Sequence, residues 1–164
     1  MLNKIINVIN ELRLKKKKEF NRILPLNELI QDRSEKAKFA GFGKGTTVYD
    51  SCHIFGDVIV GDNTWIGPFT ILDGSGGLNI GSNCSISAGV QIYSHDTVAS
   101  AITAGKSPYE YSKVIIEDCC YIGPNVVISK GVHIKHGSII GANSFVNKSF
   151  PAGSKIAGNP AKNI

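Results

Sequence analysis

Aromatic residues and long apolar stretches are scarce in this chain. Its 164 residues include one Trp, five Tyr and seven Phe, which is few for a core built around large rings. No apolar run approaches the roughly 18 residues that a membrane-spanning helix needs. The first residues include lysines but no apolar stretch with a small-residue cleavage site. We therefore predict no secretory signal and expect a cytoplasmic location.

Cysteine is also sparse, and its spacing disfavours the common cysteine sites. The four cysteines are Cys52, Cys84, Cys119 and Cys120. No two of them form a CxxC pair, which argues against zinc and thioredoxin-like chemistry. We expect reduced, structural cysteines, with Cys119 and Cys120 on opposite sides of a strand. No metal requirement is predicted.

Positive charge is concentrated near the N-terminus. The formal net charge is +5, and the run Lys15–Lys18 lies within a segment, residues 1–41, that lacks the repeat described below. Ile5, Ile9 and Leu12 recur at helical spacing and predict an amphipathic helix. Two roles stay open for it: a cap over one end of the domain, and a peripheral contact with the inner face of an anionic membrane. The basic run is local and lacks interleaved aromatics, so nucleic acid is not an expected partner.

What the chain does have is an apolar residue at almost every sixth position from Phe42 onward. Hexapeptide repeats predict an all-β solenoid, a parallel β-helix, over residues 42–164. Helical and alternating-strand patterns do not place one apolar residue in every six. Three hexads would form one triangular turn, and about five turns fit before Phe150. The repeated residues are Phe42, Val48, Ile54, Val60, Ile66, Leu72, Ile80, Ile86, Ile92, Ile116, Ile122, Ile128, Ile134, Ile140 and Val146.

Two other positions of the hexad support this fold. The fifth position is mostly small, as at Cys84 and Ser138, and fits a narrow interior. The fourth position favours Asn and Gly, which most readily adopt positive φ, so it marks the corners of the coil. The fourth-position residues are Asn63, Asn83, Gly89, Asn125, Gly131, Gly137 and Asn143.

The repeat is first interrupted at residues 73–79, where two extra residues and several glycines predict a bulge. Asp73 is the acid of this segment, and we expect it to be exposed at the rim. Trp65 takes an outward position one turn of the coil away. A Trp beside a carboxylate commonly binds a sugar, because the ring stacks on the C–H face while the acid accepts hydroxyl hydrogen bonds.

A second interruption, residues 97–113, contains Gly, Pro and two tyrosines and predicts a loop that leaves one corner of the coil. His95 stands at the root of this loop, in the fourth position of its hexad. It has two interpretations: a residue tolerated at positive φ, or a general base that works near neutral pH. His53 and His133 occupy outward positions and His136 lies in a turn. Their spacing builds no three-histidine metal site within one chain.

Several segments together resemble the hexapeptide-repeat acyltransferases. They are the Ile122-Gly123-Pro124 type of repeat, the Tyr93–Asp96 corner with the loop after it, and the closing Ala157–Lys162 segment. Among that family, the chain is most similar to galactoside, maltose and lipopolysaccharide O-acetyltransferases, over about residues 42–164.

This resemblance implies a left-handed β-helix, a homotrimer with its sites between copies, and acetyl-CoA as a co-substrate without a metal. One position departs from the family pattern. Members often offer a backbone N–H to the thioester oxygen just after the Ile-Gly of one hexad, where this chain has Pro124, which has no N–H. Gly123 or another amide would have to replace it. The residues that the resemblance assigns are His95 as catalytic base, Asp73 and Trp65 as acceptor contacts, and Ala142, Asn147, Lys148 and Lys162 as cofactor contacts.

The reaction implied is direct acetyl transfer from acetyl-CoA to a hydroxyl of a sugar or surface-polysaccharide precursor. His95 would remove the hydroxyl proton, with its ring oriented by Asp96 or by a backbone carbonyl. The alternatives are an N-acetyltransferase of a nucleotide-linked amino sugar, a serine O-acetyltransferase, a γ-class carbonic anhydrase, and a scaffold without enzymatic activity.

Overall fold

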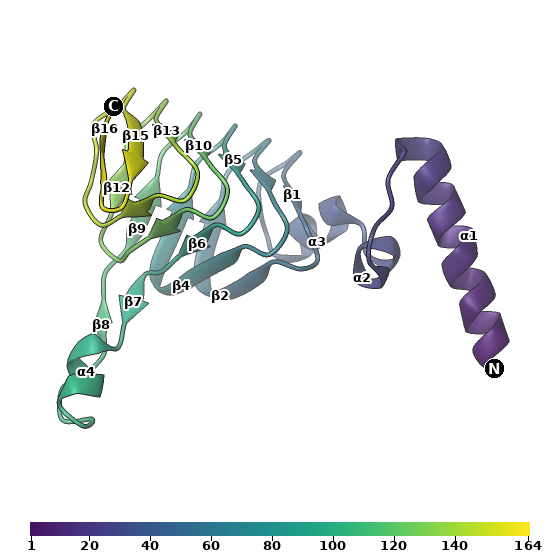
Figure 1. The fold of residues 1–164 in the computed structure, drawn as a ribbon, viewed down its shortest axis with the longest axis horizontal. Helices are drawn as coiled ribbons and strands as arrows, with labels where there is room; N and C mark the ends of the chain where they lie inside the picture. Colours follow the sequence, from purple (N-terminus) through teal and green to yellow (C-terminus); the bar gives the residue numbers. More distant parts are fainter.

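The computed structural model describes residues 1–164 as a left-handed parallel β-helix of about six turns, preceded by helices (Figure 1). The solenoid predicted from the hexads is confirmed, with one turn more than expected because the coil continues beyond Phe150 into the strand Lys155–Gly158. The strands of successive turns stack into three faces, and each face pairs in parallel register.

The first face has one short strand from each turn and ends in an antiparallel strand that closes the C-terminal end. Tyr121, for example, pairs with Ser85 of the preceding turn and Ile139 of the following one. This face consists of β1 (Thr47–Val48), β3 (Trp65–Ile66), β5 (Ser85–Ile86), β10 (Tyr121–Ile122), β13 (Ile139–Ile140), β15 (Lys155–Gly158) and the closing β16 (Ala161–Asn163).

The second and third faces are joined because two long strands run across the corner between them. These are β2 (His53–Val60) and β4 (Ile71–Ile80), which pair with a bulge between Gly56 and Val58. The second face continues through β6 (Gln91–Ile92), β11 (Val127–Ile128) and β14 (Phe145–Val146), and the third through β9 (Val114–Ile116) and β12 (His133–Ile134).

The repeat predicts the core and the turns correctly. Every apolar residue of the six-residue series is buried except Ile54, which is partly buried against the core. Cys52, Cys84 and Cys120 are buried and Cys119 is exposed, as the alternation predicts. All of the fourth-position Asn and Gly residues have positive φ. Stacked strands thus leave a narrow interior that small and aliphatic side chains fill.

Two corners of the solenoid differ in kind. The regular corner, between the first and second faces, is turned by Phe69, Gly89, Asn125 and Asn143, all at positive φ. The interrupted corner, between the second and third faces, carries Asp73–Gly77, Ser94–Asp96 and Lys130. Its bulge at Asp73–Gly77 agrees with the predicted interruption of the repeat.

The predicted loop leaves the solenoid at the interrupted corner and forms an arm, residues 97–113 (Figure 1). It contains the short helix α4 (Val98–Ile102) and returns along β8 (Glu110–Tyr111), which pairs antiparallel with β7 (His95–Asp96). His95 therefore lies in a two-stranded ladder and not at positive φ, so the conformational interpretation of this histidine is wrong.

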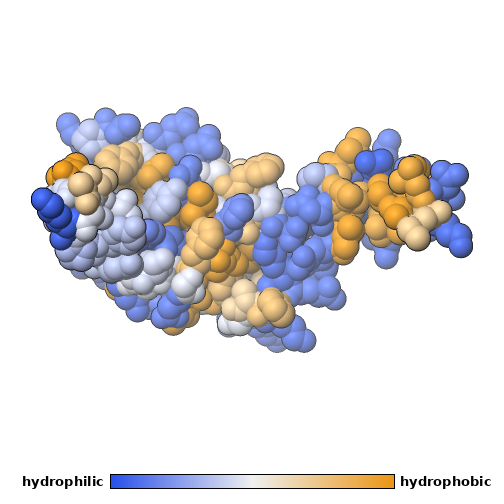
Figure 2. All heavy atoms as spheres, turned by 90° about the horizontal axis from the view of Figure 1, so that it is seen from below, coloured by the Kyte–Doolittle hydropathy of each residue, from blue (hydrophilic) through white to orange (hydrophobic).

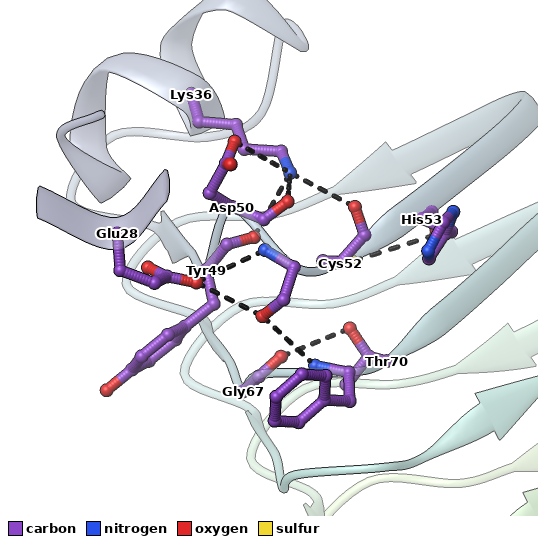
Figure 3. Close-up of polar contacts among 10 residues, drawn as sticks. Glu28, Lys36, Tyr49, Asp50, Cys52, His53, Gly67 and Thr70 are labelled. Atoms are coloured by element: carbon purple, nitrogen blue, oxygen red, sulfur yellow. Dashed lines mark hydrogen bonds and ion pairs between the residues drawn. The ribbon is translucent and has the colours of Figure 1, made fainter. Parts of the chain in front are cut away.

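The N-terminal end of the solenoid is covered by α2 (Leu26–Ile30) and α3 (Arg33–Phe39). Ala37 of α3 is buried in the core cluster. The Lys36 ammonium donates to the carbonyl oxygens of Tyr49, Asp50 and Cys52 at 3.1, 2.6 and 3.0 Å (Figure 3). The buried Glu28 carboxylate accepts hydrogen bonds from the backbone N–H and hydroxyl of Ser51. These polar contacts fix the cap on the first turn.

The long helix α1 (Leu2–Phe20) does not take part in this cap. It has no buried residue, stands away from the solenoid and contacts α2 (Figure 1). The cap expected from this amphipathic helix is therefore supplied by α2 and α3. Apolar side chains gather on the surface of this end of the molecule (Figure 2). No helix of the chain is long and apolar enough to cross a bilayer.

Candidate active site

The interrupted corner brings Asp73 and His95 into direct contact. Asp73 lies within β4 and His95 opens β7 in the next turn. The His95 Nδ1 atom is 2.6 Å from Asp73 Oδ2. The carboxylate is almost completely buried, with 3% of the side chain exposed, whereas 31% of the His95 side chain is exposed. The expectation that Asp73 is exposed at the rim is wrong, because its side chain turns inward to the histidine.

The Asp73 carboxylate is held by several hydrogen bonds besides that of His95. Oδ1 accepts the Ser75 N–H at 2.9 Å and the Ser75 hydroxyl at 2.5 Å, and Oδ2 accepts the Ser94 N–H at 3.0 Å. Burial raises the pKa of Asp73, but the hydrogen bonds from Ser75, His95 and Ser94 outweigh it and lower the pKa to about 2. Asp73 is therefore ionised at neutral pH and accepts the Nδ1 proton of His95.

This contact fixes the role of each nitrogen of the His95 ring. With its proton on Nδ1 facing Asp73, a neutral imidazole presents an unprotonated Nε2 that can accept a proton. The ring also stacks on Tyr111 of β8, with centroids 5.8 Å apart and planes 22° apart. The orienting group is thus Asp73, not the neighbouring Asp96 or a backbone carbonyl.

Asp96 turns to a different partner. Its carboxylate contacts the ammonium of Lys130, which follows β11 in the next turn, and it also accepts the Val98 N–H at 3.1 Å. Together with His95, these groups border a cavity of about 450 Å³ on the second face. The cavity is lined by Tyr93, His95, Asp96, Thr97, Val98, Val127, Ser129, Lys130 and Phe145.

The structure separates Trp65 from the dyad. Trp65 lies outward on the first face, as predicted, with 36% of its surface exposed and its ring edge-to-face with Tyr49 at 6.0 Å. Asp73 and His95 lie at the corner of the other two faces. Within one chain, Trp65 and Asp73 therefore do not form the sugar-binding pair that the sequence suggested.

The residues predicted to contact the cofactor lie toward the C-terminal turns, but on different sides of the coil. Ala142 is in the regular corner between β13 and β14, and Lys162 lies on β16, paired with Ala157. Asn147 and Lys148 follow β14 at the interrupted corner, with the Lys148 ammonium 5.6 Å from the Phe150 ring centroid. A long ligand could contact both groups only by running across the second face.

The amide of Gly123 does not replace the N–H that Pro124 lacks. Gly123 donates its N–H to the carbonyl of Ile140 at 2.8 Å as part of the strand pairing. It therefore cannot also bind a thioester oxygen without breaking this pairing.

Sequence reasoning missed four contributors to this corner: Ser75, Ser94, Tyr111 and Lys130. Ser75 follows Asp73 by two residues, and a short polar side chain at that spacing is a known turn signal. The other three come from different turns or from the far side of the arm. Their proximity depends on the register of the coil, which the hexads do not specify across an insertion.

Comparisons with known proteins agree with the fold. A family model described as bacterial transferase hexapeptide matches residues 113–148, and one described as hexapeptide repeat of succinyl-transferase matches residues 57–94. Both models describe hexapeptide-repeat transferases, and they match two separate stretches of the solenoid.

Among curated relatives, a 2,3,4,5-tetrahydropyridine-2,6-dicarboxylate N-acetyltransferase of Staphylococcus aureus is 46% identical over 67 residues. The match covers 40% of this chain and 28% of the relative, so the chain spans little more than a quarter of that protein.

Two solved structures share the fold. One is AntD, an N-acyltransferase from Bacillus cereus in complex with dTDP and 3-hydroxybutyryl-CoA. It has a TM-score of 0.67 and 23% identity, over 79% of this chain and 86% of that one. The other is the hexapeptide-repeat acetyltransferase VCA0836 of Vibrio cholerae with acetyl-CoA. It has a TM-score of 0.59 and 24% identity, over 97% of this chain and 87% of that one.

Proposed function

We propose that this chain transfers an acyl group, acetyl in the simplest case, from acyl-CoA to a sugar-linked acceptor. The observation that carries the proposal is the His95–Asp73 contact at 2.6 Å beside a cavity. An imidazole held by an ionised carboxylate, with its other nitrogen free, is the arrangement that general-base catalysis needs. The family and the acyl-CoA complexes of the structural neighbours support the reaction class.

In this mechanism His95 Nε2 removes the proton of the acceptor nucleophile as that atom attacks the thioester carbon. The new bond to the acyl carbon forms and the C–S bond breaks. The proton held by His95 then passes to the departing thiolate, so that free CoA leaves as a thiol. Asp73 stays ionised throughout and stabilises the imidazolium that forms. No covalent acyl-enzyme is required.

For the donor, we keep the predicted contacts Ala142, Asn147, Lys148 and Lys162. The pantetheine arm would lie along the second face between the two corners, with its thioester end at the cavity beside His95. The lysines would meet the phosphates of the cofactor, for which an ammonium is a suitable partner.

For the acceptor atom, two candidates follow from different observations. The resemblance of the His95 corner favours a sugar hydroxyl, as in O-acetyltransferases. The relatives favour an amine: the Staphylococcus aureus relative is an N-acetyltransferase, and AntD is an N-acyltransferase also solved with dTDP-4-amino-4,6-dideoxyglucose. His95 would serve either nucleophile in the same way.

We further propose that the active unit is a homotrimer, as the family implies. Trp65 on the first face can approach an acceptor at His95 only across a boundary between copies. Its acceptor contact stays part of this proposal, whereas the buried Asp73 would act on the acceptor through His95 and not by direct contact. Light scattering coupled to size-exclusion chromatography tests it, and a purely monomeric protein with full activity would contradict it.

We also propose that α1 contacts an anionic membrane surface. An apolar groove of about 300 Å³ runs along α1 and α2, lined by Lys4, Ile5, Val8, Ile9, Leu12, Leu26 and Ile30. The basic run Lys15–Lys18 lies on the same helix, and apolar side chains combined with basic charge favour anionic lipid. Val8→Glu should reduce co-sedimentation of the protein with phosphatidylglycerol vesicles. Equal sedimentation of variant and wild type would remove the idea.

The activity test is a release assay for free CoA thiol. Wild type and His95→Ala are incubated with acetyl-CoA and a panel of sugar hydroxyls and nucleotide-linked amino sugars. Acceptor-dependent thiol release by the wild type alone supports the proposal, and product mass separates O- from N-acylation. Equal release by both proteins would show that His95 is not the base.

A further inference from the structure

The arm at residues 97–113 is joined to the solenoid by a very short ladder. β7 and β8 pair over two residues, His95 with Tyr111 and Asp96 with Glu110. One further backbone bond, from the Ser112 N–H to the Ser94 carbonyl at 2.9 Å, follows the ladder. An isolated two-stranded ladder of this length is marginally stable in water. Something else must keep Tyr111 stacked on the His95 ring.

Lys130 provides that additional contact from the next turn of the solenoid. Its ammonium contacts the Asp96 carboxylate on β7 and lies 2.9 Å from Glu110 Oε2 on β8. Because Asp96 and Glu110 are directly paired, a single cation bridges both strands at the residue pair next to His95 and Tyr111. Only 24% of the Lys130 side chain is exposed.

We propose that Lys130 is a positioning residue that clamps the two strands of the arm together and so holds His95 in its reactive orientation. The His95 ring has two supports, Asp73 at Nδ1 and Tyr111 against its face. Lys130 controls the second of these, since a shift of β8 relative to β7 would withdraw Tyr111. The clamp also forms one wall of the cavity beside His95.

The charge states agree with this arrangement. The hydrogen bond to Lys130 holds the pKa of Asp96 below its usual value, and the bonds to Asp96 and Glu110 hold the pKa of Lys130 above its own. A single exposed ion pair contributes little to stability. One cation bridging two carboxylates on paired strands instead restricts the position of β8 relative to β7.

The inference rests on the proposed function for its catalytic consequence, but not for its structural one. Lys130→Met removes the charge and keeps most of the length of the side chain. Lys130→Arg keeps the charge. The matched control is Lys44→Met, an exposed lysine in the first turn of the solenoid.

The structural readouts do not depend on activity. In Lys130→Met, hydrogen exchange at the amides of residues 94–97 and 109–112 should accelerate about 10-fold or more, while exchange in the core strands is unchanged. The ring-proton NMR signals of His95, identified by their loss in His95→Asn, should shift because the stacked Tyr111 ring is withdrawn from the His95 ring. Lys44→Met should match the wild type in both measurements.

The kinetic readout follows from the same displacement. Lys130→Met should lower kcat about 10-fold or more, because a small misplacement of a catalytic group strongly lowers the rate of the chemical step. The KM for acyl-CoA should stay within about twofold of the wild-type value. Lys130→Arg should restore most of the exchange protection and kcat. An unchanged exchange rate or an unchanged His95 spectrum in Lys130→Met overturns the inference. So does a Lys130→Arg variant as impaired as Lys130→Met. If the wild type itself shows no acyl transfer, the proposed function fails, while exchange and NMR still decide the clamp.

Discussion

Two of the three corners of the solenoid turn the chain with different kinds of residue. At the regular corner, Gly89, Asn125 and Asn143 turn the chain at positive φ. At the interrupted corner, the chain uses a bulge, a buried carboxylate, a histidine and an ion-pair clamp. The regular corner maintains the repeat, and the interrupted corner departs from it to hold reactive groups. Stability and chemistry should therefore respond to different substitutions.

The largest expected effect is on chemistry at the interrupted corner. His95→Ala should lower kcat by a factor of about 10² to 10⁴, the range typical for loss of a general base. Its unfolding midpoint in urea should fall only modestly, because the side chain is partly exposed and outside the core, and the buried Asp73 loses one of its several hydrogen-bond partners. Steady-state kinetics and equilibrium unfolding of the same preparation measure kcat and the unfolding midpoint, respectively. Retained acyl transfer would show that this corner is not the reactive one.

The converse experiment removes a core residue from the regular part of the coil. Ile122 is completely buried and belongs to the six-residue series. Ile122→Ala should lower the free energy of unfolding by about 2–5 kcal/mol, as expected for a cavity in a close-packed interior. Chemical denaturation measures it. A loss well under 1 kcal/mol would mean that the coil is less tightly packed than its burial indicates.

Asp73→Asn should change both the free energy of unfolding and the catalytic rate. The folded pKa of Asp73, about 2, lies below the usual value for an unfolded chain, about 3.9. Its ionised form therefore stabilises the fold above pH 4, and this stabilisation is lost as the pH falls toward 2. Between pH 5 and pH 2 the wild type should lose about 2 kcal/mol more unfolding free energy than Asp73→Asn.

Denaturant titrations at several pH values, with kcat at pH 7, measure both effects of Asp73→Asn. We expect kcat to fall about 10-fold or more because the tautomer of His95 is no longer fixed. Parallel stability curves for the two proteins would contradict the assigned ionisation of Asp73.

The smallest effect concerns Phe69, an exception within the regular corner. It has φ 59°, in the stack otherwise occupied by Gly89, Asn125 and Asn143, and 69% of its surface is exposed. A left-handed conformation is strained for a bulky residue by roughly 1–2 kcal/mol. Phe69→Asn should thus stabilise the chain by about 1 kcal/mol in urea unfolding. The matched exchange, Asn125→Phe, should destabilise it. Loss of stability in Phe69→Asn would show that the ring packs against a further surface.

The sequence predicts the regular parts of the molecule well because a repeated hexad repeats its environment. The buried series, the small fifth position and the corners with positive φ each follow from one local rule applied many times. The position of the arm is also predicted, because residues 97–113 interrupt the hexad pattern. The helix at residues 1–20 is predicted as an element, but not its separation from the solenoid.

The internal arrangement of the site could not be predicted in the same way. Asp73, His95 and Lys130 come from three successive turns, and their contacts depend on insertions that change the register. Asp73 was expected at the surface because an acid in a glycine-rich segment usually faces solvent. Its burial depends on hydrogen bonds from Ser75, Ser94 and His95, which only the folded coil assembles.

A crystal structure with bound acyl-CoA would test the central assignment most directly. We expect a thioester carbon in the cavity beside His95, close enough for a nucleophile placed about 3–3.5 Å from it to reach Nε2. The remainder of the cofactor should run toward Ala142 and Lys148. A cofactor bound at a different corner, with the thioester remote from His95, would contradict it.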